Sequence, residues 1–329
     1  MSFFKSRRFL LSSLMVAMGL SVPLTPVWAQ PFPSKPVRIV IGFPPGGGID
    51  IVARTIAPKL SEALGQPVII DNKPGVAGVL GTNLVAKAPA DGHTIFFGTT
   101  GNISINPAFM PNLPFSMDKD FTPLMLVASL PFLVYAHPSV PVKNLSELVA
   151  YAKANPGKVN FYSSGNGGLP HLTGELLNNV AGIQTVHIAY KGSAPGMNDL
   201  IGGQVQLGYD TVAIGLQHIK TGRLRALATT GPKRLAILPD VPSTSEFASG
   251  LEAVNWYGMV VPAGTPREAI LRLNREITKV LEMPDIKEKL VSQGIDPAAN
   301  SPEEFGEFMK SEAAKWARVI RAANIKPDS

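Results

Sequence analysis

The chain has 329 residues, enough for two domains of ordinary size, and carries 30 Lys and Arg against 24 Asp and Glu. It has no cysteine, which excludes disulfides, thiolate metal sites and cysteine nucleophiles. Three of the cations (Lys5, Arg7 and Arg8) lie near the N-terminus, and the small positive balance that remains argues against a nucleic-acid partner.

The first 29 residues have the pattern of an export signal. Lys5, Arg7 and Arg8 precede an apolar stretch, 9–22, and small residues favour cleavage after about Ala29. The arginine pair before an apolar run also fits a twin-arginine signal, so the sequence leaves the Sec and Tat routes open. No later run of about 18 apolar residues follows. We therefore expect a soluble periplasmic protein with no membrane span once the signal is removed.

The mature chain is predicted to begin with a strand, a loop and a helix. Residues 37–41 are apolar apart from Arg38, which predicts a buried strand, and apolar residues repeat at helical steps over 49–64. Pro58 is expected to kink that helix or to cost it a hydrogen bond. The glycines at 46–48 leave backbone N–H groups uncovered at the positive end of the helix dipole, as in an anion site. A loop that merely needs unusual φ and ψ angles is the alternative. Neither the Walker nor the dinucleotide motif fits.

The rest of the chain predicts two series of strands and helices. The first contains the strands 68–71 and 94–98 and the helix 79–87, and a long apolar stretch, 121–141, is expected to cross from one lobe to the next. The second contains the helix 145–154, the strand 159–163, the helix 171–180, the strand 185–189, a helix ending near 202, the strand 205–209, a further helix and the strand 224–229. A returning strand, 256–261, and two helices that begin with capping boxes at 265–268 and 301–304 complete the chain. Each series is typical of an open α/β sheet, in which ligands lie beyond the carboxyl ends of the strands.

Few residues in these turns could carry out a reaction. Ser163 or Ser164, with His171 or His187 and Asp210, could supply the nucleophile, base and carboxylate of a hydrolase triad, although the G-x-S-x-G elbow is missing. His171 lies four residues before Glu175, but no third metal ligand has the expected spacing, so we predict no metal. Asp210 follows a strand and either faces a ligand or caps the next helix. Turns rich in backbone N–H groups and small hydroxyls favour binding without turnover, so we predict no catalytic residue and no cofactor.

Several motifs resemble those of the Bug proteins, the extracytoplasmic receptors of tripartite tricarboxylate transporters. They run in order through the mature chain: FPPGGGIDIVAR at 43–54, DNKPGVAG at 71–78, SSGNGGLPHL at 163–172, YKGSAP at 190–195, GQVQLGYD at 203–210, WYG at 256–258 and PAGTP at 262–266. Three positions depart from the family pattern. Gly168 replaces a common hydroxyl residue, Lys73 replaces the commoner Arg, and Tyr209 stands where Phe is frequent.

The resemblance implies an α/β, two-lobed type II periplasmic-binding-protein fold, each lobe an open α/β sheet, with the ligand cleft between the lobes. Lobe 1 is expected to comprise residues 30–128 and 230–329, and lobe 2 residues 129–229. The implied function is capture of a small carboxylate (a di- or tricarboxylate, an acidic amino acid or an aromatic acid) by inter-lobe closure, for uptake through transporter membrane subunits. A ligand-binding sensor for a membrane histidine kinase is the alternative, and we expect a monomer.

The loops and the resemblance together predict a set of ligand-binding residues. Backbone amides are expected to hold the carboxylate, while Asp50 or Asp210 selects a donor elsewhere on the ligand. The set comprises Phe43, Pro45, Gly46, Gly47, Gly48 and Asp50 in the first loop, Thr99, Gly101 and Asn102 after the third strand, Ser163, Ser164, Gly165, Asn166, Gly168 and His171 in the serine-glycine loop, and Tyr190, Lys191, Gly192 and Asp210.

Overall fold

The computed structural model describes residues 32–110, 112–190 and 192–326. The chain from Phe32 onward forms one compact unit. The predicted export signal and Lys191 lie outside the described residues.

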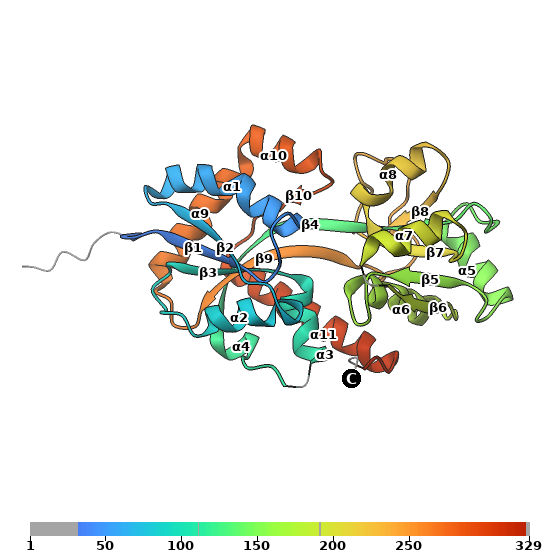
Figure 1. The fold of residues 1–329 in the computed structure, drawn as a ribbon, viewed down its shortest axis with the longest axis horizontal. Coiled ribbons are helices and arrows are strands. Elements are labelled where there is room, and N and C mark those ends of the chain that lie inside the picture. The colour runs from blue at the N-terminus through green and yellow to red at the C-terminus, as the bar shows by residue number, and fades with distance from the viewer. Residues whose placement is uncertain (1–31, 111, 191, 327–329) are drawn as a thin grey trace, which may run out of the picture. The chain divides into compact units, whose positions relative to one another are not determined.

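The strands form a ten-stranded sheet in two parts that share strand β4 (Figure 1). In the first part, β1 lies between β2 and β3, all three parallel, and β9 joins β3 to β4 in antiparallel fashion. In the second part, β5 lies between β6 and β7 in parallel, and β4 is antiparallel to β7 and β8. The strands are β1 (Val37–Ile41), β2 (Val68–Asn72), β3 (Thr94–Thr99), β4 (Phe121–Ala136), β5 (Asn160–Ser163), β6 (Val186–Ala189), β7 (Leu207–Thr211), β8 (Arg225–Thr229), β9 (Val254–Pro262) and β10 (Asp296–Pro297).

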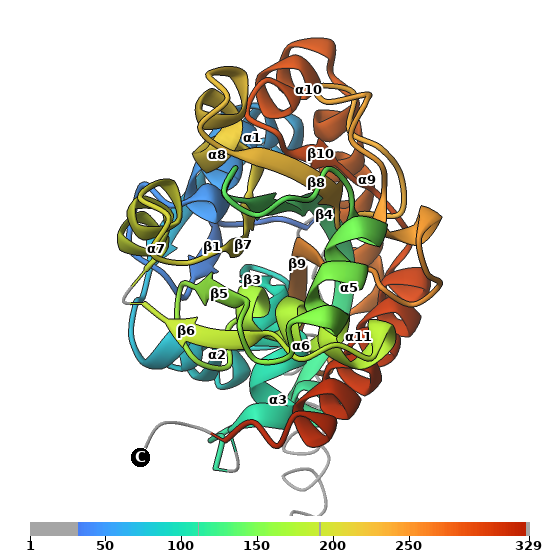
Figure 2. The same cartoon turned by 90° about the vertical axis from the view of Figure 1, so that its right-hand side faces the viewer.

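The helices lie on both parts of this sheet. They are α1 (Gly48–Leu64), α2 (Val79–Ala86), α3 (Asn106–Phe109), α4 (Met117–Asp120), α5 (Leu145–Ala154), α6 (Leu169–Ala181), α7 (Ser193–Ile201), α8 (Val212–Lys220), α9 (Arg267–Glu282), α10 (Pro284–Val291) and α11 (Pro302–Ala322). Figure 2 shows α11 running beside α3 and α6, and residues of these helices are in contact. The last long helix therefore touches elements of both parts of the sheet.

Strand β4 is the element that joins the two parts. Its residues 121–131 pair with β9, and residues 132–136 pair with β7 and β8. Its 16 residues are mostly buried, which explains the long apolar run that the sequence shows at this point. Residues 121–136 of the stretch predicted to cross between the lobes, 121–141, thus form one continuous strand. The residue boundaries of the two lobes stay a prediction.

The parallel strands place the predicted loops at the carboxyl edges of the sheet. β1 has four buried residues, and Arg38, the exception in its apolar run, lies 3.6 Å from the carboxylate of Asp71 on β2. In the second part, β5, β6 and β7 run in the same direction, so their ends at Ser163, Ala189 and Thr211 lie along one edge. This edge carries the serine-glycine loop and Asp210.

The helix α1 continues through Pro58, which is exposed, so the proline costs the helix one backbone hydrogen bond, the second of the two predicted effects. The structure corrects two other details of the sequence prediction. Thr265 does not cap α9: its hydroxyl donates to the carbonyl of Pro262, and the N-cap position is Pro266. The box at Ser301 and Glu304 does form. A third helix of the C-terminal region, α10, begins with Pro284 and was not predicted.

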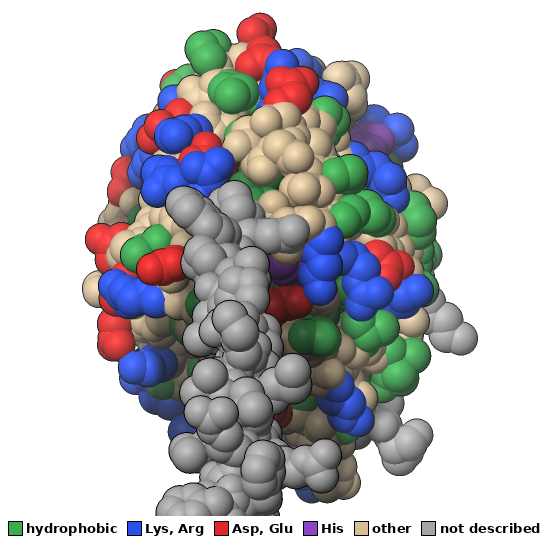
Figure 3. All heavy atoms as spheres, turned by 90° about the vertical axis from the view of Figure 1, so that its left-hand side faces the viewer, with side chains coloured by type: hydrophobic (Ala, Val, Ile, Leu, Met, Phe, Trp, Pro, Cys, Tyr) green, Lys and Arg blue, Asp and Glu red, His purple; other side chains and the backbone are tan. Residues whose placement is uncertain are grey.

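Charged side chains of both signs lie next to one another on the surface. On the face shown in Figure 3, basic and acidic residues are interspersed. Examples from the described residues are the pairs Lys35–Asp91 at 2.9 Å and Lys59–Glu62 at 3.4 Å. Such a mixture is typical of a solvated surface.

Candidate functional site

The loop between β1 and α1 carries the first group of predicted ligand-binding residues. Phe43 is half-buried, whereas Pro45, Gly46 and Gly47 are exposed. A Cβ atom on Gly46 or Gly47 would meet no heavy atom within 4 Å, so the outer side of the loop backbone is open. Gly47 is the N-cap of α1, and no side chain caps the helix. Among the described residues, the first turn of α1 therefore has no capping side chain, which suits an anion.

Asp50 lies on the buried side of this loop and accepts a hydrogen bond from its backbone. Its side chain is 3% exposed, and Oδ2 accepts hydrogen bonds from the Gly46 amide at 2.9 Å and from Nε of Arg54 at 2.8 Å. Its Oδ1 accepts a bond from Asn72 Nδ2 at 3.0 Å. Burial raises the pKa of Asp50, but hydrogen bonds from Arg54, Gly46 and Asn72 outweigh burial, and the pKa is lowered. The ionised carboxylate thus organises the glycine turn, and its selection of a ligand donor stays a prediction.

Asn102 ties a second loop to the end of β3. The residue is 1% exposed, its Oδ1 accepts a bond from the Thr99 amide at 3.2 Å, and its Nδ2 donates to the carbonyl of Ala77 at 2.7 Å. Ala77 and the preceding Val76 have φ values of 50° and 48°, a strained region for residues with a Cβ atom. Gly101 begins a helical turn, Gly101–Ile105. Asn102 therefore holds a strained loop in place beside the first one.

The serine-glycine loop is held by two histidines. Oγ of Ser163 lies 2.6 Å from Nε2 of His187, and the Gly167 amide donates to Nδ1 of His171 at 3.1 Å. The two imidazole rings stack with centroids 3.6 Å apart and planes within 10°. Burial lowers the pKa of His187 to about 4, so its ring is neutral at physiological pH. Both rings therefore fix the backbone from which Ser164, Gly165 and Gly168 project.

The C-terminal end of the described chain also reaches this loop. Nδ2 of Asn166 donates to the carbonyl oxygen of Lys326 at 3.0 Å. The phenyl ring of Phe109, at the end of α3, lies where a Cβ atom on Gly167 would stand. Gly167 has φ of 70° as well, so glycine is required there for two reasons. The serine-glycine loop is thus braced from the other part of the sheet.

Tyr190, Gly192 and Asp210 lie at the ends of the neighbouring strands. The Tyr190 hydroxyl donates to Asp199 Oδ2 at 2.6 Å, and burial, together with this carboxylate, raises the pKa of Tyr190 to about 12. Asp210 is 4% exposed and accepts bonds from the Tyr162 hydroxyl at 3.2 Å and from the Thr211 amide at 2.7 Å. Burial raises the pKa of Asp210. The carboxylate is partnered within the chain, and its contact with a ligand stays a prediction.

These contacts include one serine–histidine pair considered from the sequence but do not complete the hydrolase triad, because Asp210 accepts its bonds from Tyr162 and Thr211. The partner of Ser163 is His187, while His171 contacts the Gly167 amide and lies 3.9 Å from Glu175 through Nε2. Ser163 is fully buried, and its Oγ also lies 2.9 Å from the carbonyl of Gly165. Within residues 32–110, 112–190 and 192–326, no cluster of three potential metal ligands occurs.

A pocket of about 530 Å³ opens between α1, α8 and the turn that follows α10. Figure 1 shows α1 and α10 with the first part of the sheet and α8 with the second, so residues from both parts surround the pocket. Its lining includes Gly48 of the first loop and Thr211, the residue after Asp210, so both parts of the sheet contribute. The lining residues are Gly48, Ile51, Leu130, 211–213, Leu216, Ile237, Tyr257 and 292–295. We name this cavity the inter-lobe pocket.

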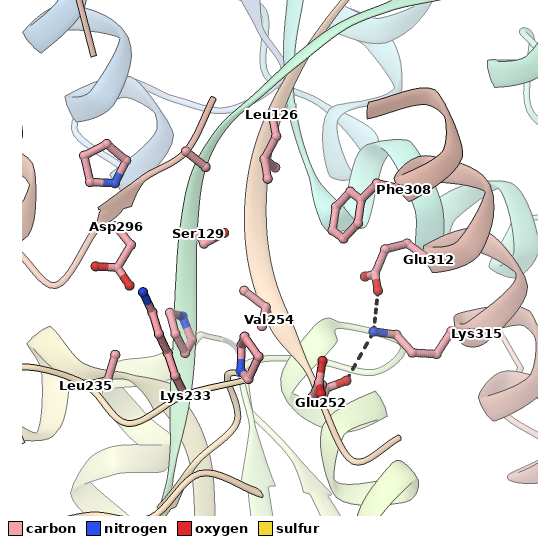
Figure 4. A pocket seen from close by; sticks show the side chains of 14 residues that line it. Leu126, Ser129, Lys233, Leu235, Glu252, Val254, Asp296, Phe308, Glu312 and Lys315 are labelled. Atoms are coloured by element: carbon pink, nitrogen blue, oxygen red, sulfur yellow. Dashed lines mark hydrogen bonds and ion pairs between the residues drawn. The ribbon is translucent and has the colours of Figure 1, made fainter. Parts of the chain in front are cut away.

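A second cavity, of about 310 Å³, lies on the other face of β4 (Figure 4). Ser129 and Pro131 line this cavity, whereas Leu130, between them, lines the inter-lobe pocket. The alternation follows from the strand, because successive side chains point to opposite faces. Unlike the inter-lobe pocket, the second cavity carries charged residues, and Figure 4 shows Lys315 paired with Glu312 on its α11 wall.

The sequence and the structure are similar to known proteins. Residues 52–325 match the model of the tripartite tricarboxylate transporter family receptor. The chain belongs to this family. It is 40% identical over 291 residues to the UPF0065 protein in the tcbD-tcbE intergenic region of Pseudomonas sp. (strain P51), covering 88% of this receptor and 86% of that protein.

Two solved structures of similar receptors contain a ligand. R. palustris Rpa4515 with adipate is 34% identical, with a TM-score of 0.75 over 90% of this chain and 100% of that one. MatC (Rpa3494) from Rhodopseudomonas palustris with bound malate is 30% identical, with a TM-score of 0.71 over 88% and 100%. The receptor has the two-lobed α/β fold of the periplasmic binding proteins, and its family consists of substrate-binding receptors rather than enzymes. Among the residues that the structure describes, no helix is long and apolar enough to span a membrane.

The sequence indicated some lining residues and missed others. Gly48 was predicted, and Tyr257 belongs to a family motif, WYG at 256–258, from which it could have been chosen. Leu130, Leu216 and the turn 292–295 were not foreseen. Nothing in a single sequence indicates that the turn after α10 reaches α8, because that contact depends on how the two parts of the sheet meet.

Proposed function

We propose that this receptor captures a small carboxylate in the periplasm and delivers it to the membrane subunits of a tripartite tricarboxylate-type transporter. The ligand lies between the two lobes, next to the first-turn amides of α1 and the serine-glycine loop. Closure of the lobes about β4 and β9 removes it from water.

The proposal depends on one observation: the lining of the inter-lobe pocket includes Gly48, the first residue of α1, a helix without a side-chain cap. The walls come from both parts of the sheet, so a bound molecule contacts both lobes at once. The open backbone of Gly46 and Gly47 leaves room for an anion beside it. Adipate and malate in the two similar receptors are both carboxylates, in agreement with this chemistry.

The supporting residues keep the loops ready for the ligand. Asp50 fixes the first turn through Arg54 and Gly46, and His171 fixes the second through Gly167. Loops that are ordered before binding lose less entropy when the ligand arrives. The receptor therefore needs no catalytic group, and its specificity depends on the shape and polarity of the pocket.

The proposal is tested by thermal denaturation of the purified receptor with a panel of carboxylates. A ligand at 100 times its dissociation constant is expected to stabilise the receptor by about 2.7 kcal/mol. In the Gly47→Asp variant the new side chain has space, and aspartate is a good N-cap, so the fold keeps its stability. Its charge repels the ligand, and the affinity for the best carboxylate is expected to fall at least about tenfold through repulsion of roughly 1.4 kcal/mol.

Gly47→Asn is the matched control, because it has the same shape as aspartate without the charge. The asparagine variant is expected to bind more tightly than the aspartate variant. A flat thermal response to every carboxylate, or equal affinity in the two variants, would contradict the proposal. The alternative of a kinase sensor shares the pocket, and genes for permease subunits beside this one would favour transport.

A further inference from the structure

The inter-lobe pocket has an uncharged, largely apolar lining. The side chains of Ile51, Leu130, Val212, Leu216 and Ile295 all contribute to it. Among the lining residues that the structure describes, a set that leaves out the predicted Lys191, none is Lys, Arg, His, Asp or Glu. The polar side chains of its described lining are those of Thr211, Tyr257, Ser292 and Gln293.

Arg54, the first cation that follows the β1–α1 loop in the sequence, already forms hydrogen bonds within the chain. Arg54 donates to Asp50 through Nε and to Asn72 through its terminal nitrogen. A ligand carboxylate that entered the apolar part of the pocket would have no positive side chain of the described lining beside it. Burial of a charge without a partner costs several kcal/mol in proteins, so such a ligand would be rejected.

Apolar groups of a ligand have the opposite effect. Each methylene group that leaves water for an apolar wall contributes about 0.8 kcal/mol, which corresponds to roughly fourfold in affinity. A hydroxyl group in the same place must give up its bonds to water and weakens binding instead. The lining thus distinguishes ligands by what is attached to their carboxylate.

We propose that this receptor selects acids with an extended hydrocarbon body, aliphatic or aromatic, and rejects hydroxy acids and tricarboxylates. One carboxylate remains at the loop backbone, as in the proposed function on which this inference depends, and the body of the acid fills the inter-lobe pocket. The second carboxylate of a diacid has to lie outside the apolar part of the lining. The selecting residues are Leu130, Val212, Leu216 and Tyr257.

Isothermal titration of the purified receptor with matched acids tests the proposal. We use butanoate, hexanoate and octanoate, the diacids succinate, glutarate and adipate, and the polar acids malate and citrate. Affinity is expected to rise about fourfold per methylene until the pocket is full. Succinate is expected to bind more tightly than malate, which differs by one hydroxyl group, and citrate is expected to bind weakest.

A variant reverses the preference. Leu216→Arg places a cation in the pocket, and the ratio of hexanoate to citrate affinity is expected to fall at least tenfold. Leu271→Arg, at an exposed position of α9 outside the pocket lining, is the matched control and should leave the ratio unchanged. Because the readout is a ratio within one protein, a general loss of stability does not imitate it.

The two proposals fail in different ways. If no acid of any kind binds, the proposed function fails. If acids bind but malate or citrate binds more tightly than its hydrocarbon counterpart, or if Leu216→Arg leaves the ratio unchanged, the proposed function stands and the selection for a hydrocarbon body is overturned.

Discussion

The hydroxyl group of Tyr257 lies against the backbone of Gly48 at the start of α1, where a larger side chain would begin. We therefore predict that position 48 requires glycine. A Cβ atom on Gly48 would stand 2.6 Å from the Tyr257 hydroxyl oxygen, well inside van der Waals contact. The next atoms of that ring, Cζ and Cε2, would lie at 3.7 and 3.9 Å, which are ordinary distances. The clash therefore depends on a single oxygen atom.

The tyrosine has little freedom to move away. It is 6% exposed, packs edge-to-face against Phe97 with ring centroids 6.1 Å apart, and lies in β9 between β3 and β4. We expect Gly48→Ala to lower the free energy of unfolding by about 1–3 kcal/mol, the usual cost of overpacking. In a Tyr257→Phe background the same change removes a flexible glycine from a helix without a clash, and it should be neutral or stabilising by up to about 1 kcal/mol.

A double-mutant cycle measures this difference. The four proteins are unfolded in urea, and fluorescence of the tryptophans, of which Trp256 and Trp316 are fully buried, reports the transition. The expected coupling energy is at least about 1 kcal/mol, above the error of the method. If Gly48→Ala costs the same with and without the hydroxyl group, the reasoning is refuted, and the glycine is needed for another reason.

Two further predictions concern buried polar groups. Glu312 is 7% exposed and accepts hydrogen bonds from the indole N–H groups of Trp256 at 3.1 Å and Trp316 at 3.0 Å. Glu312→Leu leaves both donors without an acceptor and should lower the free energy of unfolding by about 3–5 kcal/mol. Glu312→Gln keeps an acceptor and should lower it by clearly less. Urea unfolding checks this, and equal losses would contradict it. His187 has its pKa lowered from 6.5 to about 4 by burial, so the unfolded chain binds the proton first as the pH falls. Stability from this group is complete above pH 6.5 and is lost toward pH 4. The lowered pKa corresponds to about 3 kcal/mol, and because the ring is only half-buried, solvent screening reduces the loss to about 2 kcal/mol. His187→Asn should remove that part of the slope, and an unchanged slope would show that another group is responsible.

The stacked histidines show how the environment of one residue type sets its role. His171 and His187 come from α6 and β6, yet their rings lie in contact, and each bonds a different residue of the same loop. From the sequence, only His171 was expected near the ligand. His187 was considered only as a possible base for Ser163 or Ser164 and was left out of the ligand-binding set, whereas the parallel pairing of β5 and β6 brings it against Ser163.

The sequence alone determined the local elements, the two α/β series and the loops at their carboxyl edges. Helical and strand periodicity is a property of nearby residues, so β1, α1 and the capped start of α11 could be predicted from it. Only the tertiary structure decided which polar groups are used within the chain. Asp50 looked available for a ligand, but Arg54, Asn72 and the Gly46 amide surround its carboxylate. The apolar inter-lobe pocket likewise depends on Leu130, Leu216 and Tyr257, which come together only when β4 and β9 join the two parts of the sheet. Such long-range packing leaves no periodic signal in the sequence.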